Sequence, residues 1–228
     1  MVENGDTPIM ASVPRLPAGG SADNLAATYT ISDGMLTGRA SRRLTGDLCA
    51  VYENAVNSVP SDRRELMLVK TLSTGRKSVN VSNVAYHRLT PSHPILQIDY
   101  DIADEAAITR SSKADYVTID LLSDVVPAPI DTVGRQRGVF ISMPYDFIAN
   151  VTLKIPQGYS RTEVPEDYKI DNKWYEGEIK YLLTDTDVEV ECRISPREIT
   201  ARRDELDTWN LVVKEIRKAS TRRIKLIK

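Results

Sequence analysis

The chain has 228 residues, of which 41% are hydrophobic and 27% charged, a composition ordinary for a globular protein that buries a substantial core. The 30 Lys and Arg side chains nearly balance the 32 Asp and Glu side chains, so no overall field attracts the chain to nucleic acid or to an anionic membrane. No stretch approaches the roughly 18 apolar residues that a bilayer span requires. We therefore expect no nucleic-acid partner and no membrane span.

Residues 1–24 have the composition of a tail or linker. They contain several prolines and the pair Gly19-Gly20, which disfavour both helix and central strand. The segment also lacks the basic and apolar parts of a signal peptide. We expect an extended segment here, in a chain that forms part of a longer protein.

Residues 25–126 are predicted to form a β-rich subdomain with two short helices. Apolar and polar residues alternate from Leu25, turn at Asp33-Gly34 and resume at Leu36, which is the pattern of a β-hairpin. Between residues 46 and 73 the apolar period becomes helical, and this predicts the two helices. Alternation then returns and predicts further strands around residues 79–81, 96–102 and 116–122.

Residues 127–228 are predicted to form a second antiparallel subdomain. Pro127 and Pro129 stiffen the chain and remove ladder donors, so we place a boundary near residue 126. Four strands are predicted beyond it, followed by an amphipathic helix and a final strand at the C-terminus. The predicted strands cover residues 139–143, 147–153, 173–183 and 188–194, the helix about 203–219, and the last strand 222–228. The sequence thus predicts a mainly β, or α+β, fold of antiparallel, sandwich-like subdomains with a few peripheral helices.

Cys49 is the sharpest catalytic candidate in the sequence. A thiol in the first turn of a helix gains thiolate character, and His87 or His93 would be its base. However, Cys49 shares an apolar stripe with its helical neighbours, which favours a buried small hydrophobe. Cys192 lies in the inward phase of a predicted strand, so we expect both cysteines in the core and no catalytic residue.

The sequence predicts no metal site and no cofactor. The two histidines do not form a helical His-Glu-x-x-His pair. The acidic run 99–105 lacks the glycine and the terminal glutamate of an EF-hand, and no glycine-rich phosphate loop occurs. Asp187, Glu189 and Glu191 are predicted on the wet face of a strand. A pair of carboxylates meeting across a sheet, as glycoside hydrolysis requires, remains an alternative.

Two sets of residues are candidates for surface binding. Arg222 and Arg223 belong to a basic cluster at the C-terminus that would suit phosphate or an acidic polymer, although a solvated helix face and a protected edge strand also explain it. Trp174 and Tyr175 are candidate exposed aromatics for a carbohydrate- or polymer-binding β-sandwich, which is our alternative function. Tyr100 and Tyr116 would join them.

Several short motifs are characteristic of one known arrangement. Residues 32–38 (Ser-Asp-Gly-Met-Leu-Thr-Gly) form an Asp-Gly hairpin, Gly46 precedes a helix, and residues 153–159 read Leu-Lys-Ile-Pro-Gln-Gly-Tyr. The motif set is completed by Arg137, Val164-Pro165, and the terminal helix and strand within residues 216–228. Together these motifs resemble the C-terminal, non-catalytic region of exported transglutaminase-like proteins common in Bacteroidetes-type bacteria, over nearly the whole chain.

The resemblance implies a function and a location. In that family a Cys-His-Asp triad lies on a papain-like core upstream of this region, and none of the triad motifs occurs here. We therefore expect a non-catalytic accessory or interaction module, without cofactor, in the periplasm or at the cell surface. Its implied partner is its own upstream core, with another protein or a glycan as alternatives. Trp209 departs from the tyrosine usual in the family, which affects packing more than function.

Overall fold

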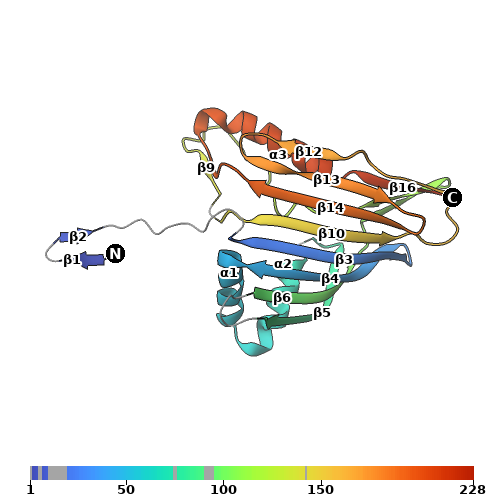
Figure 1. The fold of residues 1–228 in the computed structure, drawn as a ribbon, viewed down its shortest axis with the longest axis horizontal. Coiled ribbons are helices and arrows are strands. Elements are labelled where there is room, and N and C mark those ends of the chain that lie inside the picture. Colours follow the sequence, from blue (N-terminus) through green and yellow to red (C-terminus); the bar gives the residue numbers. More distant parts are fainter. Residues whose placement is uncertain (1, 5–6, 10–19, 74–75, 90–94, 142) are drawn as a thin grey trace.

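The computed structural model describes residues 2–4, 7–9, 20–73, 76–89, 95–141 and 143–228 (Figure 1). Its main element is an eight-stranded sheet with the order β12-β13-β14-β10-β3-β4-β6-β5. These strands are, in chain order, β3 (Ala22–Ser32), β4 (Met35–Thr45), β5 (Val79–Arg88), β6 (Ile95–Asp104), β10 (Asp146–Lys154), β12 (Tyr168–Asp171), β13 (Tyr175–Leu183) and β14 (Asp187–Pro196).

Two antiparallel units make up this sheet. One unit is β3-β4-β6-β5, and the other is β10-β14-β13-β12. They are joined by β3 and β10, which pair in parallel over eight residues, from Ala22 opposite Asp146 to Tyr29 opposite Leu153. Parallel neighbours need a long connection between them, and here about half of the chain separates the two strands.

The remaining strands form small sheets. A four-stranded antiparallel sheet has the order β11-β16-β8-β7, with two further two-stranded sheets, β1-β2 and β15-β9. Their bounds are β1 (Val2–Asn4), β2 (Thr7–Ile9), β7 (Ile108–Arg110), β8 (Ala114–Thr118), β9 (Val139–Phe140), β11 (Arg161–Glu163), β15 (Thr200–Ala201) and β16 (Arg223–Ile227).

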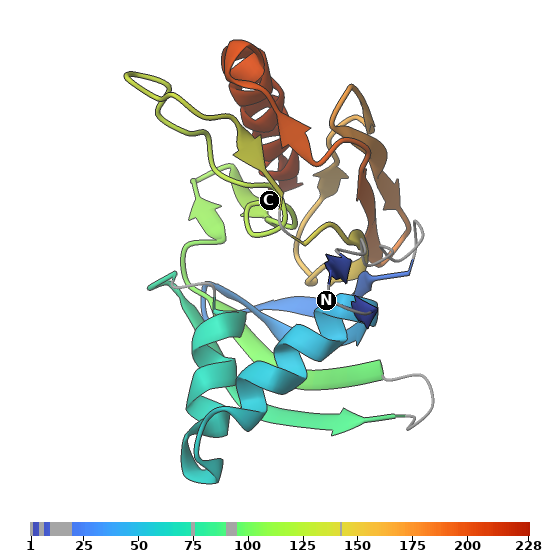
Figure 2. The same cartoon turned by 90° about the vertical axis from the view of Figure 1, so that its left-hand side faces the viewer.

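Three α-helices lie on one side of the large sheet. They are α1 (Gly46–Asn57), α2 (Arg64–Leu72) and α3 (Leu206–Ser220), preceded in two places by short 3-10 helices η1 (Ser61–Arg63) and η2 (Arg203–Glu205). Figure 1 looks onto the opposite side, where the strands stand in front and α2 and α3 lie behind them; Figure 2 shows the same layers from the end of the sheet. Among the described residues, helices therefore cover one side of the sheet, and no helix covers the other, which we call the open face.

The core lies between the large sheet and the elements behind it. Alternate residues point inward, as in β14, where Val188, Val190, Cys192 and Ile194 are buried and the residues between them are exposed. The inward side chains of both units belong to one hydrophobic cluster, which also takes in the buried face of α3. A sheet with one buried and one solvated face is the usual condition for antiparallel strands.

The hairpin β3-β4 is set by its turn. Asp33 and Gly34 both have positive φ, 51° and 84°, as a two-residue type I′ turn requires, and Asp-Gly favours this conformation. Further along, Gly38 lies so close to β3 that an added Cβ would be 2.1 Å from the carbonyl oxygen of Thr28. The turn thus fixes the register, and Gly38 permits close approach of the two strands.

The structure confirms the predicted fold class, which is mainly β, or α+β, with antiparallel pairing dominant. The short strands β7, β11, β12 and β15 were not predicted, and three further departures affect how the fold is organised. Strand β3 begins at Ala22, inside the predicted tail, and β1-β2 also falls within that segment. The strand predicted at 139–143 is the two-residue β9, which pairs with β15 and not with the large sheet. Finally, both larger sheets contain strands from either side of residue 126, so the predicted boundary does not separate two cores.

Candidate functional site

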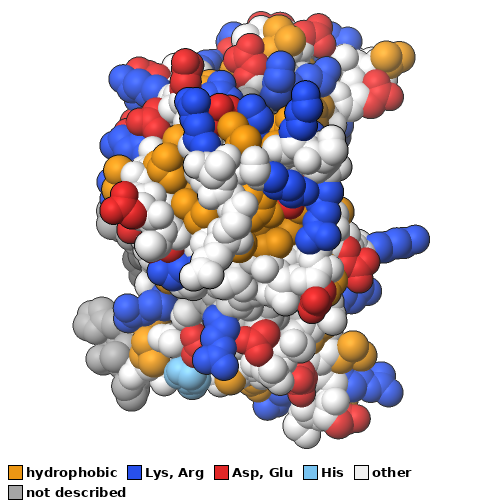
Figure 3. Space-filling view, turned by 90° about the vertical axis from the view of Figure 1, so that its right-hand side faces the viewer, with side chains coloured by type: hydrophobic (Ala, Val, Ile, Leu, Met, Phe, Trp, Pro, Cys, Tyr) orange, Lys and Arg blue, Asp and Glu red, His pale blue; other side chains and the backbone are white. Residues whose placement is uncertain are grey.

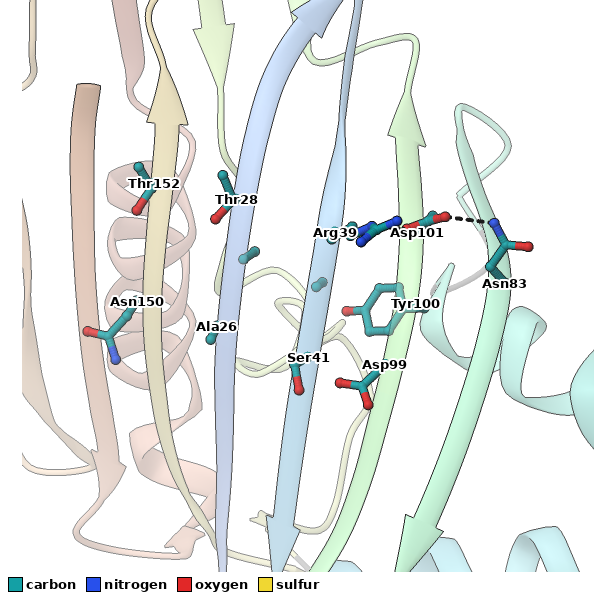
Figure 4. Close-up of a pocket in the computed structure, with 12 residues that line it drawn as sticks. Ala26, Thr28, Arg39, Ser41, Asn83, Asp99, Tyr100, Asp101, Asn150 and Thr152 are labelled. Atoms are coloured by element: carbon teal, nitrogen blue, oxygen red, sulfur yellow. Dashed lines mark hydrogen bonds and ion pairs between the residues drawn. The ribbon is translucent and has the colours of Figure 1, made fainter. Parts of the chain in front are cut away.

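The open face of the large sheet is hollowed over β10, β3, β4, β6 and β5 (Figure 4). We call this hollow, of about 690 Å³, the trough. Its floor carries the outward side chains of the central strands, and polar side chains border it on the β6 and β5 side. The floor residues are Ala26, Thr28, Ser41, Asn150 and Thr152, and the bordering residues are Arg39, Asn83, Asp99 and Asp101.

Small side chains on directly opposed residues form the floor. Ala26 faces Ser41 on β4 and Asn150 on β10, and Thr28 faces Thr152. Residues at i and i+2 of a strand share a face, so Ala26 and Thr28 lie in line along β3. Because these side chains are short and the strands on either side carry longer ones, the centre of the face is lower than its borders.

A connected set of polar contacts forms the border at β6. Arg39 Nε lies 3.4 Å from Asp101 Oδ1, and Asn83 Nδ2 donates to Asp101 Oδ2 at 2.7 Å. Asn83 has a positive φ of 52° at the irregularity of β5 between Ser82 and Ala85, and this β-bulge turns its side chain toward β6, as Figure 4 shows. The contacts hold Asp101 in place beside the floor.

Beyond β10, the exposed face of β14 carries two glutamates next to the floor residues. Glu191 on β14 is paired with Asn150, and Glu189 with Thr152. Both glutamates are exposed, and within the described part of the chain neither makes an ion pair or a side-chain hydrogen bond. The trough therefore offers hydroxyl and amide groups on its floor and an ion-paired border at β6, and β14 beside it carries two carboxylates, of which Glu191 lies opposite Lys180 on β13. This chemistry suits a polar partner surface.

Sequence reasoning missed the trough. Alternation along each strand indicates which side chains share the outward face, and the hydroxyl and amide side chains of β3 and β10 belong to that face. What the pattern did not contain was the pairing of these two strands, which are far apart in sequence. Without that pairing, Ala26 and Asn150 had no reason to be treated as neighbours.

The structure separates Cys49 from the base proposed for it. Cys49 lies on α1 with no exposed surface, and burial, followed by the charge of Glu53, raises the pKa of its thiol. His87 lies on β5, is half exposed, and its Nε2 is 3.7 Å from Asp99 Oδ2 on the open face. His93 falls outside the described residues. Cys49 and His87 thus lie on opposite sides of the sheet, and the prediction that Cys49 is buried is confirmed.

Cys192 is likewise a core residue, as predicted. It is 1% exposed on the inward side of β14, and burial raises the pKa of its thiol to about 12. Of the three acidic residues predicted on the wet face of this strand, Glu189 and Glu191 are exposed and point away from Val188 and Val190, as expected, whereas the side chain of Asp187 is only 15% exposed and pairs with Lys154. Among the described residues, no three His, Cys, Asp or Glu side chains are grouped so as to hold a metal ion.

The prediction that Trp174 and Tyr175 are exposed binding aromatics is wrong. They are 3% and 4% exposed, because the turn before β13 directs both into the core. Asn172 Oδ1 accepts hydrogen bonds from the backbone N–H groups of both residues, and Trp174 Nε1 donates to the carbonyl of Thr200 at 3.0 Å. Tyr100 is also buried, at 8% exposed, which leaves only Tyr116 half-buried among the four aromatics named.

The basic cluster at the C-terminus divides into two groups. In the first, Arg217 donates to the carbonyls of Ser123 and Val126, Lys225 pairs with Glu163, and Lys228 pairs with Asp115. The second group is Lys218, Arg222 and Arg223, which line an open groove of about 850 Å³. Figure 3, which looks at the right-hand end of Figure 1, shows Lys and Arg side chains around hydrophobic ones.

No protein-family model matches the chain, and no curated protein does. The resemblance to transglutaminase-like proteins therefore rests on the sequence motifs alone. In the part of the chain that the structure describes, no helix combines the length and the apolar character needed to cross a membrane.

Proposed function

We propose that this chain is a non-catalytic accessory module of an exported transglutaminase-like protein of the periplasm or cell surface, and that its trough docks the papain-like core of the same protein. The trough is the observation that carries the proposal. It is a hollow on an otherwise regular sheet face, with short polar side chains at its centre and the ion pair of Arg39 and Asp101 at one border.

The chemistry of the trough favours a folded protein surface over a glycan. Carbohydrate platforms rely on exposed aromatic rings, and Trp174, Tyr175 and Tyr100 are all buried. Protein interfaces, in contrast, use hydroxyl, amide and charged groups to form about one hydrogen bond per 100–200 Å². Thr28, Asn150 and Thr152 supply such groups on a floor made rigid by hydrogen-bonded strands.

The position of β3 favours a partner on the same chain. This strand begins at Ala22 and contributes Ala26 and Thr28 to the floor. A core domain that precedes it would be tethered at the end of the strand that carries the docking surface. Tethering raises the effective concentration of such a partner to the order of millimolar, so even a weak polar interface would be occupied.

The first test is to read the coding sequence that precedes this segment in the same gene. It should encode a papain-like core with Cys, His and Asp in that order. The second measures binding of that core, produced separately, to this chain by calorimetry. Ala26→Arg places a long cation on the floor and should weaken binding by about tenfold or more, since a central clash removes the best-packed contacts.

Leu211→Arg is the matched control, because Leu211 is exposed on α3, on the other side of the sheet. It adds the same charge and should leave the affinity unchanged. Equal binding by the parent chain and Ala26→Arg, with both folded by circular dichroism, would rule out the trough as the docking surface. Absence of a papain-like core upstream would rule out the family assignment.

A further inference from the structure

We infer that the groove lined by Lys218, Arg222 and Arg223 is a second binding site, which takes a carboxylate group of an acidic peptide. The groove is formed by the end of α3, the start of β16 and the segment that leads into β12, and it measures about 850 Å³. Because α3 lies behind the sheet, this site is distinct from the trough. The inference does not depend on the function proposed for the open face.

Three cations converge on this groove from neighbouring positions of the chain. Lys218 is in the last turn of α3, Arg222 lies in the connection that follows, and Arg223 begins β16. Within the described residues none of the three forms an ion pair. Lys214, although exposed on the same helix, is not part of the lining.

Arg222 is held in place by uncharged partners. Its Nη1 donates to the main-chain carbonyl of Glu166 at 3.0 Å, and its guanidinium lies 5.2 Å from the centre of the Tyr168 ring. A carbonyl and an aromatic face orient a guanidinium without neutralising it. The remaining N–H groups are fixed in direction and can meet a carboxylate in the paired geometry that makes arginine effective in recognising such groups.

The charge balance of the groove selects the ligand. Its lining includes two carboxylates, Glu166 and Glu215, against the three cations, which leaves a net charge of +1. The charge of Glu215 contributes, after burial, to raising the pKa of Tyr168, so its field is felt at the ring under Arg222. A single carboxylate neutralises the excess charge of the groove, whereas a dianion such as phosphate would leave it with a net charge of −1.

The other walls suit a peptide. Pro165 and Tyr168 are half-buried and offer apolar surface beside Arg222. An extended peptide can cover such a surface with its main chain while one acidic side chain reaches the guanidinium. Aromatic surface next to arginine is a frequent composition of protein-binding sites.

Binding can be followed by NMR titration of the isotope-labelled chain. The probe is the blocked tripeptide acetyl-Gly-Glu-Gly-amide, compared with acetyl-Gly-Gln-Gly-amide and with inorganic phosphate at equal ionic strength. We expect saturable shifts at residues 165–168 and 218–223 with the Glu peptide, and binding about tenfold weaker with the Gln peptide, because only the former supplies a charge-assisted hydrogen bond.

Arg222→Gln keeps a donor for the Glu166 carbonyl but removes the charge, and it should weaken Glu-peptide binding by about tenfold. Arg161→Gln is the matched control, because Arg161 is an exposed arginine on β11 that does not line the groove, and it should have no effect. Glu215→Gln should strengthen binding, which a merely structural role of the groove would not produce. The inference would be overturned if the Glu peptide gave no saturable shifts or if the Gln peptide bound equally well. It would also be overturned if phosphate bound more tightly or if Arg222→Gln left binding unchanged.

Discussion

Asp23 on β3 and Arg42 on β4 form a buried ion pair on the inward side of the sheet, beneath the trough. Arg42 Nε lies 3.2 Å from Asp23 Oδ1, and its Nη2 contacts the other carboxylate oxygen. The side chain of Asp23 is 2% exposed and that of Arg42 is 16% exposed. The pair therefore links the two strands that carry Ala26 and Ser41, and it does so in the core of the sheet that supports the floor.

Removing one partner of this pair should be strongly destabilising. Asp23→Ala leaves the Arg42 charge buried without compensation, a change that typically costs about 3–5 kcal/mol. The control is Arg39→Ala, which breaks a pair on the open face whose arginine side chain is 90% exposed. Exposed pairs contribute only about 0–1 kcal/mol. Urea unfolding of both variants should therefore show a much larger loss for Asp23→Ala, and similar losses would contradict the structural role of the pair.

Asp115 should make stability sensitive to acid. Its side chain is 3% exposed, with Lys228 Nζ at 2.7 Å and the Tyr159 hydroxyl donating at 2.6 Å. Burial opposes ionisation, but these partners outweigh burial and hold the pKa of Asp115 below its usual value. A lowered carboxyl pKa gives stability that is present above the unfolded-state value of about 3.9 and is lost as pH falls below it.

The measurement is the free energy of unfolding by urea between neutral pH and pH 3. The fall in stability toward acid should be smaller in Asp115→Asn than in the parent chain, because the variant has no carboxylate to protonate at this site. Lys228→Ala should show an intermediate acid dependence. If Asp115→Asn kept the full acid dependence of the parent, the loss would originate elsewhere.

The hydrogen bond between Tyr159 and Asp115 should also make stability sensitive to alkali, so that stability falls as the pH rises. Burial, together with the hydrogen bond to Asp115, raises the pKa of Tyr159 to about 12. A raised tyrosine pKa gives stability that is complete below the unfolded-state value of about 10 and is lost as pH rises through 12. Tyr159→Phe should reduce this alkaline loss, as read from thermal melts between pH 9 and pH 12. An undiminished loss would show that Tyr159 is not its source.

Cys49 should behave as a buried thiol and not as a nucleophile. In the Cys192→Ala background, iodoacetamide at pH 7 should modify Cys49 slowly, because it has no exposed surface and its thiol pKa is raised. Addition of urea to unfold the chain should accelerate the reaction. His87→Ala should leave the folded-state rate unchanged, since His87 lies on the opposite side of the sheet. Fast alkylation of the folded chain that depends on His87 would contradict the proposed absence of catalysis.

Gly38→Ala should destabilise the β3-β4 hairpin. The added Cβ would lie 2.1 Å from the Thr28 carbonyl oxygen, which belongs to the backbone and has little freedom to move. The control is Gly134→Ala, where φ is +69° but no atom lies within 4 Å of the new Cβ. That control carries only the strain of a left-handed residue, of order 1 kcal/mol. Thermal denaturation should show a larger decrease for Gly38→Ala, and the reverse order would contradict the close approach of the strands.

Local features of the sequence were sufficient for several elements of the fold. The Asp33-Gly34 turn, the two helices between residues 46 and 73 and the burial of Cys49 and Cys192 follow from periodicity and turn chemistry. These signals depend on residues a few positions apart. The two antiparallel units were also identifiable, because their strands follow one another along the chain.

Only the tertiary structure decided how the units combine and which faces remain open. The parallel pairing of β3 with β10 joins strands more than a hundred residues apart, and no local pattern specifies that contact. The same applies to Trp174. The alternating pattern around it did not determine which face it occupies, and the turn at Asn172 places it in the core. It applies also to the basic cluster, where Arg217 donates to a main-chain carbonyl of Val126 and Arg222 lines a groove. Periodicity tells which side chains share a face, but the burial of that face depends on packing between distant segments.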